Sequence, residues 1–89
     1  MTSMLDEKRQ FANYIDLKKY LADSGINMSY IAINRSVSDL DFCIQEDNDS
    51  IAVFWFERGI YFDKMTFADR NLAISYYLKL INKNISLFK

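Results

Sequence analysis

The chain has 89 residues, of which 51% are hydrophobic and 16% aromatic, and its formal net charge is −1. This length and composition predict one folded domain over residues 1–89 with a single core, and they exclude a disordered chain. No apolar run approaches the roughly 20 residues of a membrane-spanning helix, and the N-terminus lacks the apolar segment of a signal peptide, so we expect a cytoplasmic protein without membrane contact.

The first predicted helix covers residues 13–24. Three apolar residues recur at the spacing of one helical face: Tyr14, Leu17 and Leu21. Asn13, with Asp16 three residues later, forms a start signal, and Gly25 can end the helix because glycine readily adopts the left-handed conformation of a C-terminal cap. A start signal of the same spacing begins at Ser3, and a helix that starts near residue 5 is the alternative.

Four strands are predicted next: residues 27–34, 39–45, 50–57 and 60–63. The second has the clearest alternation, with one face expected to be buried (Leu40, Phe42, Ile44) and the other largely exposed to water (Asp41, Cys43, Gln45). The third is apolar on both faces, which is typical of a central strand covered on both sides, and we expect Trp55 to lie in the core. Short connections between these strands predict an antiparallel meander.

The last predicted helix begins at Thr66, which has Asp69 three residues later as a capping partner. Its apolar face is formed by five residues at helical spacing: Ala73, Tyr76, Tyr77, Leu80 and Ile81. The tail at residues 84–89 is compatible with an edge strand or with coil. The predicted fold class is α+β, a four-stranded antiparallel meander flanked by an N-terminal and a C-terminal helix in the order α-β-β-β-β-α.

Residues that usually carry catalysis are missing or isolated in this sequence. It contains no histidine, which excludes imidazole chemistry and most zinc sites. Gly25 and Gly59 are isolated, so there is no glycine-rich phosphate loop. Cys43 is the single cysteine, and we expect it to be a small buried residue in a strand. We therefore predict a protein that is not an enzyme and that binds no cofactor or metal ion.

Acidic residues are concentrated in the middle of the chain. Residues 36–63 contain seven acidic side chains and one basic, whereas residues 64–89 contain five basic and one acidic. An acidic surface repels nucleic acid and attracts a basic protein, although a solvated sheet rim is an alternative explanation. We expect a hairpin to gather these carboxylates at one end of the sheet. The predicted partner-binding residues are Asp39, Asp41, Glu46, Asp47, Asp49 and Glu57.

Residues 50–83 contain an aromatic strand that ends Trp55-Phe56-Glu57-Arg58-Gly59, then Phe62, then a helix with alanine and tyrosine. The helix residues concerned are Leu72, Ala73, Tyr76, Tyr77, Leu78, Leu80 and Ile81. This part of the chain resembles small bacterial immunity proteins, the cytosolic antitoxins of contact-dependent growth inhibition and related polymorphic toxin systems. The resemblance implies a non-catalytic protein that binds and blocks one toxin domain, often a basic nuclease. It assigns no contact residues, because these proteins differ in fold and in toxin-binding residues.

Two other functions are compatible with the same residues. The first is an acidic phage- or plasmid-borne inhibitor that mimics nucleic acid and blocks a nucleic-acid enzyme. The second is a structural homodimer that pairs through an apolar sheet face. If both helices cover the same face of the sheet, alternate residues of 51–56 form an exposed apolar patch on the other face, which we expect to bind a second copy or a partner.

Overall fold

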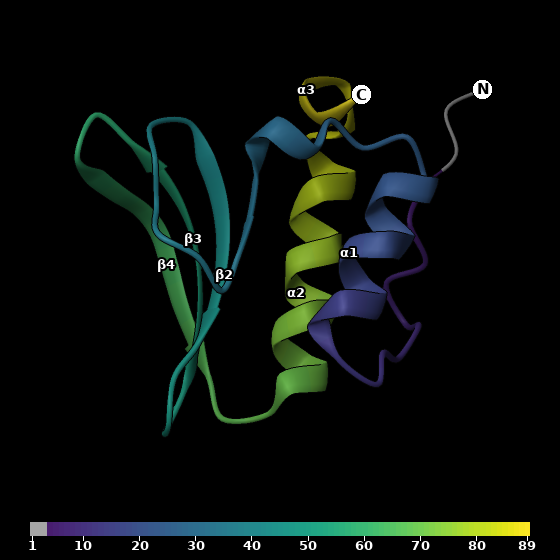
Figure 1. Cartoon of the computed structure of the whole chain (residues 1–89), viewed down its shortest axis with the longest axis horizontal. Coiled ribbons are helices and arrows are strands. Elements are labelled where there is room, and N and C mark those ends of the chain that lie inside the picture. The colour runs from purple at the N-terminus through teal and green to yellow at the C-terminus, as the bar shows by residue number, and fades with distance from the viewer. Residues whose placement is uncertain (1–3) are drawn as a thin grey trace.

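A mixed four-stranded sheet with helices packed against one side forms the fold of this chain, for which a computed structural model describes residues 4–89 (Figure 1). In chain order the elements are α1 (Tyr14–Asp23), the 3₁₀ turn η1 (Met28–Tyr30), β1 (Ile31–Ile33), β2 (Asp41–Glu46), β3 (Ile51–Glu57), β4 (Ile60–Phe67), α2 (Arg70–Lys83) and α3 (Ile85–Phe88). The α+β class is confirmed. The prediction of a wholly antiparallel sheet is wrong, because β1 pairs with β2 in parallel, while the pairs β2–β3 and β3–β4 are antiparallel.

The parallel pair β1–β2 requires the chain to return to the end of the sheet at which β1 began. The two strands place Ala32 opposite Cys43, and residues 34–40 make the return. A hydrophobic cluster on the sheet face away from the helices joins Ala32, Cys43 and Phe54, and Val37 of the return segment packs against it. The connection between two strands therefore covers part of a sheet face that the sequence pattern predicts to be exposed.

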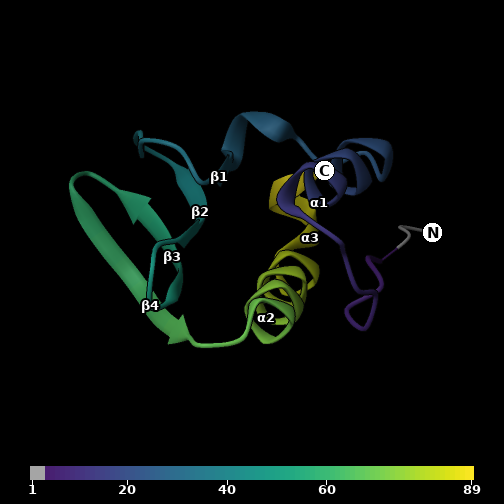
Figure 2. The same cartoon turned by 60° about the horizontal axis from the view of Figure 1, so that its bottom comes forward.

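Both α1 and α2 lie on the same side of the sheet (Figures 1 and 2). The main core between the helices and the sheet contains Leu17 and Leu21 of α1, Phe42, Ile44, Ile51 and Val53 of the strands, and Ala73, Ile74, Tyr77, Leu78 and Ile81 of α2. Trp55 only packs against the edge of this core and is partly exposed, so its predicted central position is wrong. The reason is that the β3–β4 hairpin bends away from the end of α2 and leaves Trp55 lining an open groove (Figure 1).

The helix ends depend on short polar side chains and one glycine. The Asn13 side chain accepts a hydrogen bond from the Asp16 backbone N–H at 2.9 Å, which confirms the predicted start of α1. The alternative start is wrong for the described residues, since 4–13 are not helical; Ser3 lies outside them. Gly25, with φ +83°, lets the next backbone N–H donate to the Leu21 carbonyl, which closes α1 in a Schellman motif.

The last helix begins later than the sequence pattern predicts. Asp69 is the N-cap of α2, and its side chain accepts a hydrogen bond from the Asn71 N–H at 2.9 Å. Thr66 belongs to β4, which is longer than predicted and continues to Phe67. The C-terminal tail is neither a strand nor coil: α3 buries Phe88 against the core.

The β3–β4 hairpin combines a tight turn with a bulge. Arg58 and Gly59 have φ values of +54° and +77°, the conformation of a two-residue type I′ turn. Further along, Asp63 and Lys64 oppose the single residue Phe54, because Val53 pairs with Met65 and Trp55 with Phe62. A bulge increases the local twist of a strand. The hairpin bends so that its turn lies further from α2 than its other end does (Figure 1).

The N-terminal segment is attached to α2 by one buried amide. Asn82, 5% exposed, accepts a hydrogen bond from the Leu5 backbone N–H at 2.8 Å and donates one to the Leu5 carbonyl at 2.9 Å. Leu5 and Phe11 are thereby placed in the main core.

Within residues 4–89, no helix has both the length and the apolar character required to cross a bilayer.

Candidate partner-binding surface

The six acidic residues predicted to bind a partner do not form one cluster. Asp39 lies beside the β3–β4 turn, where its Oδ1 accepts a hydrogen bond from the Arg58 backbone N–H at 2.6 Å, and Glu57 ends β3 at the same turn. Glu46, Asp47 and Asp49 lie at the β2–β3 turn, at the other end of β2. The expectation that a hairpin gathers these carboxylates at one end of the sheet is therefore wrong, because the length of β2 separates them.

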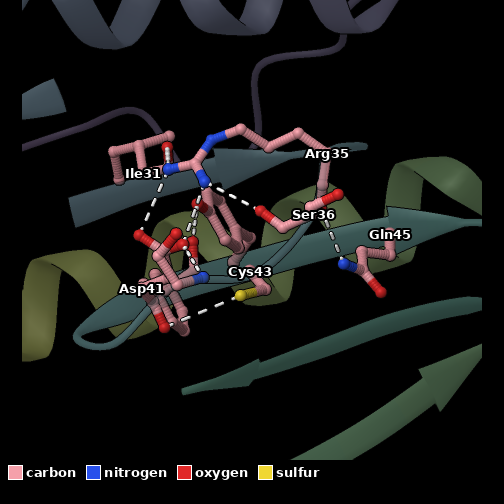
Figure 3. A network of polar contacts seen from close by, with 9 residues as sticks. Ile31, Arg35, Ser36, Asp41, Cys43 and Gln45 are labelled. Carbon is pink, nitrogen blue, oxygen red and sulfur yellow. Dashed lines mark hydrogen bonds and ion pairs between the residues drawn. The ribbon is translucent and has the colours of Figure 1, made fainter. Parts of the chain in front are cut away.

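Asp41 belongs to neither group, because it is buried (Figure 3). Its carboxylate accepts hydrogen bonds from both Arg35 Nη atoms, at 3.0 and 3.1 Å, and from the Ser38 backbone N–H at 2.7 Å. Arg35 and Ser38 are both on the return segment, residues 34–40. Asp41 thus holds this segment on the sheet, and the expectation that it faces water and contacts a partner is wrong.

Cys43 shares this covered face with Asp41. Its side chain is fully buried, as predicted for a small core residue. Burial, and to a lesser extent the negative charge of Asp41, raises the pKa of the thiol to about 12. The thiol therefore stays protonated near neutral pH, and it is not a nucleophile there.

Glu46 connects the sheet to both long helices. It accepts a hydrogen bond from the Tyr14 hydroxyl at 2.5 Å and two from Arg70, at 3.0 Å from Nε and 3.2 Å from Nη2. The hydrogen bonds from Arg70, and then from Tyr14, hold the pKa of Glu46 below its ordinary value. Glu46 is thus already paired within the chain although it is exposed, and Asp47 and Asp49 are the other exposed carboxylates of this turn.

A groove of about 540 Å³ opens at the other end of the sheet, between the β3–β4 hairpin and the C-terminal part of the helices. Its apolar lining includes Leu40, Trp55, Phe62, Leu80 and Leu87. The charged residues among its described lining are both acidic, Glu57 and Asp63. The groove exists because the hairpin bends away from α2, whose last turn and the following α3 form the facing wall.

Edge strand β4 carries exposed apolar side chains on both of its faces, and Phe62 among them lines the groove. The exposed fractions are 55% for Ile60, 54% for Tyr61, 43% for Phe62 and 46% for Met65. Tyr61 lies on the face away from the helices, where its ring contacts those of Phe54 and Phe56 at 4.9 and 5.0 Å between centroids. Exposed apolar side chains in such a concentration are typical of a protein-binding surface.

Sequence patterns did not indicate the groove. Leu40 was expected on the buried face of β2, but it precedes the strand and is 42% exposed. Leu87 belongs to a tail whose structure was left open, and it is 48% exposed on α3. The available signal was weak: an apolar residue between two aspartates, and an apolar tail after a helix.

Within residues 4–89, no group of three or more histidine, cysteine or acidic side chains is placed to hold a metal ion. Comparison with known proteins finds no matching family, no significantly similar curated protein and no significantly similar solved structure.

Proposed function

We propose that this chain is an immunity protein that binds and blocks a cognate toxin domain with a basic surface, such as a nuclease, and that it does so in the cytoplasm without catalysing a reaction. The observation that carries the proposal is the exposed apolar surface of β4 and the adjoining groove, bordered by Asp39, Glu57 and Asp63. An apolar centre with a charged rim is the usual anatomy of a protein interface.

The charge around this surface supports a basic partner. Glu57 and Asp63 line the groove itself, and Asp39 lies at the adjoining turn. Arg58 of this turn, whose Nε lies 4.0 Å from Glu57 Oε2, offsets only part of their negative charge. Complementary charge accelerates association and excludes partners of the same sign, which suits an inhibitor that must act before its toxin does damage. A nuclease that binds a phosphate backbone needs a basic surface of this kind.

The local structure of the second half also supports the proposal. The resemblance to immunity proteins implies a strand that ends in Glu-Arg-Gly, a short strand and a helix. β3, the turn at Arg58 and Gly59, β4 and α2 follow in this order, although β4 (Ile60–Phe67) is longer than the short strand that the resemblance implies.

Mimicry of nucleic acid is less well supported by the same structure. A mimic must present carboxylates in a continuous row to replace regularly spaced phosphates. Here Asp41 is buried, Glu46 is bound by Arg70, and the remaining carboxylates lie at opposite ends of β2.

Co-expression tests the proposal. The toxin domain encoded by the gene next to that of this chain is induced in a sensitive bacterium, with this chain or with an unrelated protein of similar size. We expect growth to be restored only by this chain, and the two proteins to co-purify. Cell death at high levels of folded chain, without co-purification, would contradict the proposed function.

A further inference from the structure

We propose that the groove between the β3–β4 hairpin and the C-terminal end of α2 is an anchor site for one large apolar side chain of a partner protein, flanked on that protein by lysine or arginine. This inference rests on the proposed function, since it specifies what part of the toxin domain the chain recognises. The lining on which it depends is an apolar wall with two acidic residues, Glu57 and Asp63.

Leu40 lines the groove with its backbone in a strained conformation. Its φ of +62° lies in the left-handed region, which is unfavourable for a residue with a side chain. Strained residues persist only where the surroundings enforce them, and they are frequent at binding sites. Because the Leu40 side chain is still 42% exposed, the strain is not compensated by full burial within the chain.

The two residues beside Leu40 enforce this conformation. Asp39 accepts a hydrogen bond from the Arg58 N–H at 2.6 Å, and the Asp41 carboxylate is bound by Arg35 and Ser38. The backbone on both sides of Leu40 is therefore fixed before any partner arrives. A contact that is already ordered loses little conformational entropy on binding, which raises affinity.

Trp55 supplies the aromatic part of the groove. It packs against Tyr30 with ring centroids 6.4 Å apart, and its indole N–H donates to Glu57 Oε1 at 3.0 Å. This hydrogen bond fixes the tryptophan and the acidic side chain relative to one another. A partly exposed tryptophan in an apolar groove is a frequent centre of binding energy, and a neighbouring carboxylate selects a basic neighbour for the inserted side chain.

A short synthetic peptide can test the groove without the toxin. The probe is a capped hexapeptide with two leucines between pairs of lysines. Its matched controls replace the lysines by glutamates, or the leucines by serines. Trp55 is the single tryptophan of the chain, so its fluorescence and its indole N–H resonance report directly from the groove. We expect saturable changes with the lysine–leucine peptide and none with either control at the same concentrations.

Matched variants assign the binding to the groove. Leu87→Ser removes an exposed groove side chain, and Leu72→Ser, at a position 60% exposed on α2 and outside the groove lining, is the control. We expect Leu87→Ser to weaken peptide binding about threefold to tenfold, as for loss of part of a leucine contact, and Leu72→Ser to leave it unchanged. Leu40→Gly should weaken binding similarly while its melting temperature stays equal or rises, because glycine tolerates the positive φ.

Several results would overturn the inference. Absence of binding by the lysine–leucine peptide, or equal binding of the glutamate peptide, would contradict the proposed anchor chemistry. Dimerisation of the free chain in sedimentation, abolished by Leu87→Ser, would show that a second copy occupies the groove instead. An unchanged dissociation constant of the Leu87→Ser variant for the toxin domain would remove the groove from the interface and leave the proposed function standing. Peptide binding by a chain that neutralises no toxin would support the groove and contradict the function.

Discussion

Arg35 and Asp41 form a two-pronged ion pair, with both terminal nitrogens of the guanidinium within 3.1 Å of the carboxylate, on the sheet face away from the helices. The pair joins the start of β2 to the segment that returns the chain from β1. Ser38 of the same segment donates its N–H to the carboxylate. Asp41 is therefore a residue of the fold, although its charge and its position in an alternating strand suggest a surface residue.

Replacement of Asp41 tests this role in stability. We expect Asp41→Ala to lower the free energy of unfolding by about 2–3 kcal/mol. This is below the range for a fully buried pair, because the Arg35 side chain is 44% exposed and can be solvated once Asp41 is removed. The matched change Asp49→Ala, in an exposed turn, should stay within about 0.5 kcal/mol. Urea denaturation measures both, and equal values for the two variants would mean that Asp41 does not hold the return segment.

The hydrogen bond between Tyr77 and the Phe42 carbonyl is the second internal contact to test. The rings of these residues stack 4.3 Å apart, and the hydroxyl of Tyr77 donates at 2.7 Å in a fully buried position. Tyr77→Phe keeps the stacked ring and removes this buried hydrogen bond, so we expect a loss of about 0.5–1.5 kcal/mol. Tyr76→Phe, on the same helix but only partly buried, is the control, with little change in denaturant midpoint. A midpoint shift of the same size in both variants would contradict the assignment.

Burial of the Cys43 thiol predicts a loss of stability in alkaline solution. Its pKa is about 12 in the folded chain against an ordinary value of 9.0, so above pH 9 the unfolded chain loses this proton first. The contribution of the thiol to stability is thus complete below pH 9 and is lost as the pH rises toward 12. Between pH 8.5 and 10, below most tyrosine ionisation, the free energy of unfolding should fall more steeply for the wild type than for Cys43→Ala. Parallel profiles would show that the thiol ionises equally in both states.

Asp47 and Asp49 are predicted to speed the approach of a basic partner. Replacing Glu46 as well would break its contacts with Arg70 and Tyr14, so the double variant Asp47→Asn/Asp49→Asn isolates the exposed charges. We expect association with the toxin domain to slow several-fold to about tenfold at low salt, and the difference to shrink at physiological salt, where exposed charges are screened beyond about 8 Å. Stopped-flow mixing measures this rate. An unchanged rate at low salt would show that the carboxylates of this turn do not steer the toxin toward the groove at the other end of β2.

Local patterns predicted most of the elements correctly. The Asn13 cap, the buried Leu17 and Leu21 of α1 and the turn at Arg58 and Gly59 depend on neighbouring residues and are confirmed. The predicted apolar face of α2 is only partly right: Tyr76 and Leu80 are partly exposed, and Ile74 and Leu78 are buried beside Ala73, Tyr77 and Ile81. The end of β4 was misplaced, because a bulge at Asp63 lets the strand continue where an uninterrupted alternation would end. A bulge of this kind leaves no strong signature in a single sequence.

The errors that matter most come from one long-range event. Parallel pairing of β1 with β2 folds residues 34–40 back over the sheet, which buries Asp41 and Cys43 together. The alternation of polar and apolar residues in β2 does not indicate that residues 34–40 will cover Asp41 and Cys43. The groove escaped prediction for a similar reason, since it depends on how far the β3–β4 hairpin bends from α2 and brings together Leu40, Phe62 and Leu87 from distant parts of the chain.

Titration of the toxin domain with this chain tests the proposed inhibition most directly. The purified toxin domain is assayed for its nuclease activity on a defined DNA and RNA substrate, with increasing amounts of wild-type chain at low and at physiological salt. The proposed function predicts a linear loss of activity that is complete at a one-to-one ratio, with tighter binding at low salt. Full activity in the presence of a large molar excess of folded chain would contradict it.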